Sequence, residues 1–261
     1  MAPKKRFGQN FLTDPNAAKK IADAAAPAGG TVLEIGPGTG ALTEPLLERA
    51  AHVVAIERDP DLIPVLHEKF ESAIEGGRIT LIEGDATALD WVSLLQRFPR
   101  PHAVAGNVPY LITGRLIEMA TNIADHIDRA VFMVQKEVAD RLLAQPGTKE
   151  YGALTVFVAA AFVTERVAVV RRGSFFPRPE VDSAVVQFTT VKPRRAVETD
   201  LFREAVKMAF AMRRKTLRNA WRGLGGWSDE EIAGRAEKAG ISLDARGETL
   251  GVEAFWKMTV N

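Results

Sequence analysis

The four residues Asn107-Val108-Pro109-Tyr110 combine two hydrogen-bond acceptors with an aromatic ring. The side-chain oxygen of Asn107 and the backbone carbonyl of Val108 can each accept one hydrogen of the same amino group, and Pro109 stiffens the loop. The Tyr110 ring can stack on a flat base. Such a loop can hold an amine attached to an aromatic ring and aim its nitrogen lone pair at an electrophile. Positioning of this kind can lower a reaction barrier by roughly 7–11 kcal/mol.

Two acidic residues indicate a second ligand. Glu57 ends a short apolar run and lies 21 residues after Gly36, and Asp85 follows the next apolar run. A carboxylate at the position of Glu57 can accept both hydroxyls of a ribose. The Asp85 carboxylate can accept from the amine of an adenine, and Ala86 offers a backbone N–H beside it. These residues predict that a nucleotide-like cofactor binds here.

The segment Thr31–Gly40 must position this cofactor. Its apolar first half predicts a buried parallel strand, and its second half is the loop Gly36-Pro37-Gly38-Thr39-Gly40. Glycines there allow positive φ angles and let a ligand lie against bare backbone. We expect a helix over Ala41–Arg49 whose free N–H groups point back at the loop. The spacing Gly36-x-Gly38-x-x-Ala41 also fits a dinucleotide site.

Apolar runs predict seven strands in total. They are Thr31–Ile35, His52–Glu57, Arg78–Glu83, His102–Gly106, Ala130–Gln135, Arg166–Val170 and Ser183–Thr189. Acids after the second and third strands, and Asn-x-Pro-Tyr after the fourth, resemble the S-adenosylmethionine methyltransferases that act on amino groups of bases. A dehydrogenase would not need that tetrapeptide, so the methyltransferase interpretation is favoured over the dinucleotide one. The resemblance implies an α/β fold with a Rossmann-like class I methyltransferase sheet, mostly parallel with its last strand antiparallel.

Composition excludes several kinds of site. The chain has 261 residues, of which 46% are hydrophobic, enough for one large domain and a small second one. It contains no cysteine, which excludes disulfides, zinc–thiolate sites and thiol nucleophiles. Its four histidines are scattered, and we expect no metal site. No apolar run approaches a membrane span and no signal peptide is evident, so we expect a cytoplasmic protein.

The net charge of +1 is unevenly distributed. Residues 1–20 carry five basic and one acidic side chain, and residues 192–222 carry ten basic and three acidic ones. Two basic regions on an otherwise acidic chain predict a polyanionic partner.

The opening Phe7-Gly8-Gln9-Asn10-Phe11-Leu12 resembles that of the ribosomal RNA adenine dimethyltransferases, the KsgA/RsmA family. Residues 135–141, 151–154 and 175–185 match further motifs of this family in the same order, so the resemblance covers nearly the whole chain. It implies cofactor contacts for Asn10 and Leu12, in addition to Gly36, Gly38, Glu57, Asp85, Ala86 and Asn107. It also implies that Phe175 stacks on the target base opposite Tyr110; the alternative is that Phe175 and Phe176 are both core residues between strands.

The resemblance divides the chain into a catalytic domain, residues 1–191, and a helical RNA-binding domain, residues 192–261. From Asp200 onward, helical spacing predicts one apolar and one basic face. Basic faces are most often merely solvated, but acids are nearly missing from this one. We therefore expect RNA contacts from Arg203, Lys207, Arg214, Arg218 and Arg222, together with Lys4, Lys5 and Arg6 near the N-terminus.

The resemblance implies N6,N6-dimethylation of two adjacent adenosines in a 3′-terminal hairpin loop of 16S ribosomal RNA. The partner would be an assembling 30S subunit, the methyl donor S-adenosylmethionine, and the enzyme a monomer. An Erm-type enzyme acting on 23S RNA is the nearest alternative, but the Phe-Gly-Gln-Asn-Phe-Leu opening and the basic residues 213–218 favour the enzyme that acts on 16S RNA. A non-catalytic RNA-binding factor on the same fold is a second alternative, against which the intact Asn107–Tyr110 argues.

Overall fold

The computed structural model describes residues 3–4 and 7–260, so Lys5 and Arg6, two of the predicted RNA-binding residues, lie outside the described part. The chain divides into two compact units. The first comprises Met1–Ala139 and Thr164–Thr190, and the second comprises Asp140–Val163 and Val191–Asn261. In the described residues no helix combines the length and the apolar character that crossing a membrane requires.

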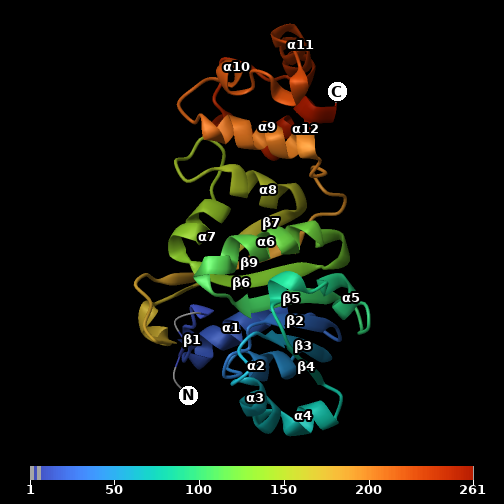
Figure 1. Ribbon diagram of the computed structural model, residues 1–261, viewed down its shortest axis with the longest axis vertical. Helices are drawn as coiled ribbons and strands as arrows, with labels where there is room; N and C mark the ends of the chain where they lie inside the picture. The colour runs from blue at the N-terminus through green and yellow to red at the C-terminus, as the bar shows by residue number, and fades with distance from the viewer. Residues whose placement is uncertain (1–2, 5–6, 261) are drawn as a thin grey trace. The chain divides into compact units, whose positions relative to one another are not determined.

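The first unit is built on a seven-stranded sheet in the order β4-β3-β2-β5-β6-β9-β7 (Figure 1). The strands are β2 (Thr31–Ile35), β3 (His52–Glu57), β4 (Ile79–Glu83), β5 (His102–Asn107), β6 (Arg129–Gln135), β7 (Phe162–Val170) and β9 (Ser183–Thr190). Strands β2 to β6 pair in parallel, and β9 pairs antiparallel with β6. The predicted sheet, mostly parallel with an antiparallel last strand, is therefore confirmed.

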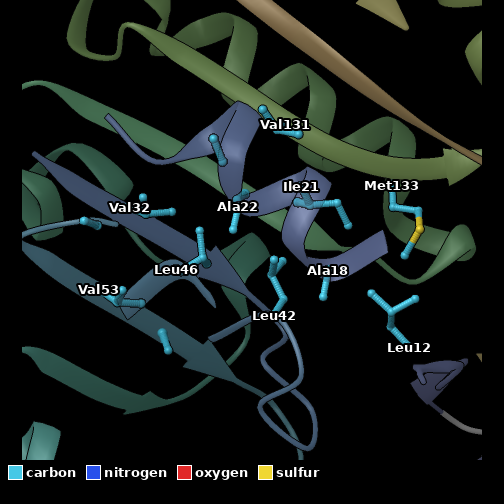
Figure 2. Packing of buried hydrophobic residues seen from close by; sticks show 14 of the residues in the cluster. Leu12, Ala18, Ile21, Ala22, Val32, Leu42, Leu46, Val53, Val131 and Met133 are labelled. Atoms are coloured by element: carbon cyan, nitrogen blue, oxygen red, sulfur yellow. The ribbon is translucent and has the colours of Figure 1, made fainter. Parts of the chain in front are cut away.

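The central strands are continuous apolar runs because helices cover both of their faces. Every residue of β2 and β3 is buried. Val32 and Val53 project to the face on which Leu46 of the second helix lies, and Ile21 of the first helix belongs to the same buried cluster (Figure 2). This packing holds the carboxyl ends of the strands, where the predicted site residues lie, in a fixed arrangement.

The helices of the first unit are α1 (Pro15–Ala25), α2 (Thr43–Leu47), α3 (Ile63–Lys69), α4 (Glu71–Glu75), α5 (Trp91–Leu95) and α6 (Thr113–Asn122). The predicted helix over Ala41–Arg49 is wrong in its bounds, because only Thr43–Leu47 is regular helix. The glycine loop continues into turns over residues 38–42, since Gly38 and Gly40 both have positive φ angles. Helix α7 (Lys136–Leu142) runs from the first unit into the second.

A two-stranded sheet that the sequence did not predict ties the N-terminal segment to the later part of the unit. Strand β1 (Phe11–Leu12) pairs antiparallel with β8 (Phe175–Phe176), so that Phe11 lies opposite Phe176 and Leu12 opposite Phe175. In addition, the Ser174 hydroxyl donates to the Asp14 carboxylate over 3.0 Å. Two-residue strands carry too little pattern to be recognised in a sequence.

The second unit consists of α8 (Ala153–Ala161), α9 (Asp200–Ala211), α10 (Leu217–Ala220), α11 (Asp229–Ala239) and α12 (Val252–Val260). Its core contains Phe202, Trp221 and Phe255. Helix α8 belongs to this core, because its Val156 is buried there. Residues 140–163 therefore pack with the C-terminal helices, whereas the sequence analysis assigned them to the catalytic domain.

Candidate active site

The glycine loop turns sharply beside a cavity of the first unit. Gly36 has a φ of 69°, and a Cβ added to it would meet no atom within 4 Å, so its bare backbone faces open space. Gly40 is needed for another reason, since a Cβ there would lie 2.5 Å from the Phe70 ring. The loop therefore offers the backbone surface against which the predicted cofactor can lie.

Glu57 is held at the end of β3 by backbone donors. Its Oε2 accepts from the N–H of Gly38 over 3.0 Å, and its Oε1 accepts from the N–H of Asp59 over 2.7 Å. Burial raises the pKa of this carboxyl, and the backbone N–H groups act against that shift. A carboxylate has about four acceptor positions, so Glu57 can accept ribose hydroxyls in addition to these backbone donors.

Asp85 follows β4 on the same edge of the sheet. Its Oδ1 accepts from the N–H and the hydroxyl of Thr87, and its Oδ2 lies 3.4 Å from the Arg58 guanidinium. Partial burial acts to raise its pKa, but these hydrogen bonds and the Arg58 charge bring the pKa below its ordinary value. The carboxylate is therefore ionised and fixed, as an acceptor for an adenine amine must be.

Asn107 ends β5, and one hydrogen bond fixes the orientation of its amide. The Nδ2 donates to the backbone carbonyl of Asn10 over 2.9 Å. Because a carbonyl can only accept, the nitrogen must face Asn10, which leaves Oδ1 as the atom that an incoming amine can use. The same bond places Asn10 beside the loop Asn107–Tyr110.

Tyr110 is oriented by a residue from a distant part of the chain. Its hydroxyl forms a 2.8 Å hydrogen bond with the hydroxyl of Ser183, the first residue of β9. Burial raises the pKa of the Tyr110 phenol, so the ring remains neutral at physiological pH. A neutral ring in a fixed orientation suits stacking on a base.

All these groups line one cavity. Its wall is formed from residues within 7–12, 35–42, 56–58, 84–86 and 107–112. The predicted cofactor residues lie in this wall, and so do the predicted catalytic residues other than Phe175. The cavity has bare glycine backbone at Gly36 and the carboxyl groups of Glu57 and Asp85, which are acceptors that a nucleoside needs for its ribose hydroxyls and its base amine, so the residues present fit S-adenosylmethionine.

Phe175 is not where the sequence analysis expected it. Its side chain is only 5% exposed and belongs to the apolar core that includes Leu12, and it does not line the cavity. Phe176 is 61% exposed, and it lies opposite the cavity residue Phe11 in the small sheet. The alternation of side chains along β8 explains the difference, because neighbouring residues of a strand face opposite sides.

Comparison with known proteins identifies the family. Residues 2–256 match the family described as ribosomal RNA adenine dimethylase. The chain belongs to this family. It is therefore an S-adenosylmethionine-dependent enzyme that methylates adenine in ribosomal RNA.

Curated relatives of this adenine dimethylase are named ribosomal RNA small subunit methyltransferase A. The protein of Geobacter metallireducens is 43% identical over 257 residues, which cover 97% of this chain and 92% of the relative. The protein of Aromatoleum aromaticum is 41% identical over 259 residues, covering 98% and 92%. A dimethyladenosine transferase from Plasmodium falciparum has a similar structure, with a TM-score of 0.79, 26% identity and 95% of each chain covered. The 23S rRNA methyltransferase ErmE gives a TM-score of 0.70 at 27% identity, covering 96% of this chain and 98% of that one.

The dimethylase carries a buried acid whose role the sequence left open. Glu34 in β2 is fully buried, and neither carboxylate oxygen makes a hydrogen bond in the described structure. Burial raises the pKa of Glu34 to about 8. The Thr43 hydroxyl weakens this shift without reaching hydrogen-bonding geometry, and the Glu57 charge adds to the shift. Glu34, in the strand that leads into the glycine loop, is therefore predominantly protonated below about pH 8.

The basic residues of the dimethylase's second unit do not form one continuous helical face. Helix α9 ends at Ala211 and α10 begins at Leu217, so the predicted single periodicity is interrupted. Arg203 pairs with Glu198 over 2.9 Å, and Arg218 pairs with Asp244 over 3.2 Å. The acids come from other segments, which a helical projection cannot show.

Three of the residues predicted to bind RNA in that unit keep unpaired charges. Lys207, Arg214 and Arg222 have no acidic partner among the residues that the structure describes. Near the other end of the chain, Lys4 is engaged with Asp59 and Asp61 in the first unit. These ion pairs fix the N-terminal segment on the cofactor side of the cavity and make Lys4 a less suitable ligand for RNA.

The cavity also contains residues that the sequence analysis did not single out. Gln9 donates to the Asp59 carboxylate over 2.9 Å, and the Arg58 guanidinium lies 5.6 Å from the centre of the Phe7 ring. Leu111 follows Tyr110 in the cavity wall. The only feature of the sequence that could have indicated these residues as part of the cavity is their position next to the recognised motifs.

Proposed function

We propose that this enzyme dimethylates the exocyclic amines of two adjacent adenosines in the 3′-terminal hairpin loop of 16S ribosomal RNA. The observation that carries the proposal is the fixed amide of Asn107, whose oxygen is turned toward an incoming amine by the bond to Asn10. The names of the relatives at 41–43% identity support the small subunit rather than the large one as the substrate.

Asn107 and Val108 position the nucleophile. The exocyclic amine of adenine is a poor nucleophile because its lone pair is delocalised into the ring. The Asn107 oxygen and the Val108 carbonyl hold its two hydrogens, which draws the nitrogen toward tetrahedral geometry and exposes the lone pair. S-adenosylmethionine, when bound, supplies a methyl group on a positively charged sulfur. No general base is required, because the methylated amine is acidic enough to release its proton to water.

The second methyl transfer depends more than the first on the aromatic rings that stack on the target base. After the first transfer one N–H remains, and either Asn107 or Val108 can hold it, but not both. The fixed ring of Tyr110 must then contribute more to the orientation of the base. The exposed Phe176 is better placed than the buried Phe175 to provide an opposing ring.

The substrate particle and the state of the enzyme are part of the same proposal. We propose that the substrate is the small subunit during its assembly, that catalysis takes place in the cytoplasm with the ribosomes, and that the enzyme acts as a monomer. Sedimentation of the free enzyme should then give a mass near 28.4 kDa.

Nucleoside mass spectrometry of ribosomal particles tests the substrate. Unmethylated small and large subunits are incubated separately with enzyme and S-adenosylmethionine. Dimethyladenosine should appear only in RNA of the small subunit, at two adjacent positions. Methylation of the large subunit alone would refute the assignment.

Asn107→Ala tests the role of the amide. Single-turnover methylation should fall by roughly 100-fold or more, on the order expected for loss of a positioning group. Equilibrium binding of S-adenosylmethionine should change little by comparison, because the other predicted cofactor residues, Glu57 and Asp85 among them, are unchanged. Asn16→Ala, an exposed asparagine of α1, is the matched control and should retain both properties. Loss of cofactor binding with an unchanged rate would contradict the role given to Asn107.

A further inference from the structure

Leu111 is the most exposed large apolar side chain among the described residues. It is 84% exposed, yet it lies in the cavity wall directly after Tyr110. A single exposed leucine on a protein surface is ordinary. An exposed leucine at the edge of a cavity that receives a nucleobase can contact the RNA bases next to that nucleobase.

The surface beside Leu111 is open and carries a positive charge. Leu111 lies in the short turn Tyr110–Ile112 that precedes α6, and Gly114 and Arg115 lie in the first turn of α6; all three residues are exposed. A Cβ added to Gly114 would meet no atom within 4 Å, so the backbone of α6 is open to solvent at this position, next to Arg115. Arg115 has an exposed ion pair with Glu118 over 3.2 Å, of a kind that contributes little and can exchange for a phosphate.

A base that turns into the cavity leaves a gap in the RNA stack. Taking a base out of its stack is unfavourable, and proteins that distort nucleic acids often place an apolar side chain between bases. Leucine is one of the residues used in this way. Leu111 lies next to the ring on which the target base stacks, so its side chain is close to the gap.

We propose that Leu111 inserts into the RNA stack where the target adenosine has left it, and packs against the adjacent base. Arg115, next to the open position of Gly114, then binds the RNA backbone. The proposal rests on the proposed function, because the neighbour of each target would be the second adenosine of the pair. Leu111 would thus stabilise the flipped state of one adenosine by covering the other.

Leu111 has little to do in the free protein. Its Cδ1 lies 3.8 Å from the position that a Cβ on Gly8 would occupy, but it belongs to neither apolar core. Truncating it should therefore leave the folded structure intact and the predicted cofactor residues in place, although Leu111 itself is part of the cavity wall. The role of Leu111 can therefore be tested by mutation in the complete, folded enzyme.

The test uses unmethylated small-subunit particles whose 3′-terminal hairpin carries 2-aminopurine at one target position. Fluorescence of 2-aminopurine increases when the base leaves its stack, and methylation of unlabelled particles is measured in parallel. The variants are Leu111→Ala, Leu111→Asn, which is polar and of similar length, and Leu111→Met, which is apolar and flexible. Val169→Ala removes an apolar side chain that is 52% exposed on β7 and does not line the cavity.

For Leu111→Ala we expect roughly a tenfold fall in kcat/KM for the particle, as the removal of most of the apolar surface predicts. The fluorescence increase should fall in parallel, while S-adenosylmethionine affinity and melting temperature stay unchanged. Leu111→Asn should behave like the alanine variant, and Leu111→Met and Val169→Ala should behave like the wild type. Equal fluorescence and kcat/KM in the alanine variant and the wild type would overturn the proposal, as would full activity of Leu111→Asn.

The wild type in the same assay separates this inference from the proposed function. If the wild type does not dimethylate small-subunit particles, the proposed function fails. If the wild type is active and Leu111→Ala matches it, only the insertion of Leu111 fails.

Discussion

Replacing Glu34 by glutamine should change how stability depends on pH. In the native protein this carboxyl is fully buried without a hydrogen-bond partner, and its pKa is raised from 4.5 to about 8. In the unfolded chain it is solvated and has its ordinary pKa. Glutamine has nearly the same shape and cannot ionise, so it removes this difference and little else.

The sign and the size of the effect follow from proton linkage. Between pH 4.5 and about 8 the unfolded chain has lost the proton that the native protein keeps, so Glu34 lowers stability as pH rises through this window. At about 1.36 kcal/mol per pH unit, the free energy of unfolding falls by about 2.5 kcal/mol between about pH 5.5 and 7.5 from this group alone. Glu34→Gln does not show this decrease. Its stability relative to the wild type should therefore rise by about 2.5 kcal/mol over the same interval.

Urea denaturation of both proteins from about pH 5.5 to 7.5, followed by circular dichroism, measures this difference. Other titrating groups contribute equally to both proteins and cancel. Glu44→Gln is the matched control, since the Glu44 side chain is 65% exposed on α2 and its solvation changes little on unfolding. Carbon-13 NMR of the Glu34 carboxyl gives the protonation state directly.

A stability difference between Glu34→Gln and the wild type that does not vary with pH would refute this reasoning. It would mean that Glu34 is ionised in the native protein throughout the interval and has a polar partner. The same conclusion would follow from a carbon-13 shift typical of a carboxylate at about pH 6.

Three further predictions concern the basic residues of the second unit and the two neighbouring phenylalanines Phe175 and Phe176. Changing Lys207, Arg214 and Arg222 together to glutamine should weaken RNA binding without affecting cofactor affinity. The slope of log affinity against log salt concentration should become shallower by about 0.7–0.9 for each phosphate that the protein no longer neutralises. An unchanged slope would show that these residues are only solvated. Phe175→Ala should reduce the free energy of unfolding by about 3–5 kcal/mol because the side chain is buried. Phe176→Ala should leave stability nearly unchanged but slow the second methyl transfer more than the first, so that monomethyladenosine accumulates. If nucleoside mass spectrometry shows both transfers slowed equally, the Phe176 ring does not stack on the base opposite Tyr110.

The sequence alone determined the sheet and the chemistry at its edge. Strands such as His52–Glu57 are long apolar runs bounded by turn residues, and this pattern survives in any tertiary context. The residues that follow them were recognisable because a parallel sheet brings all its carboxyl ends to one edge. Glu57, Asp85 and Asn107 could therefore be assigned to one site before the structure was known.

The tertiary structure alone decided which of two neighbouring side chains is buried and which is exposed. Phe175 and Phe176 are identical in type and adjacent in sequence, and only the pairing of β8 with β1 buries one and exposes the other. The pairing of Arg218 with Asp244, 26 residues further along the chain, likewise carries no signal in the sequence. A one-dimensional pattern records hydrophobicity and spacing, whereas ion pairs, burial and cavity walls arise from interactions between segments distant in the chain.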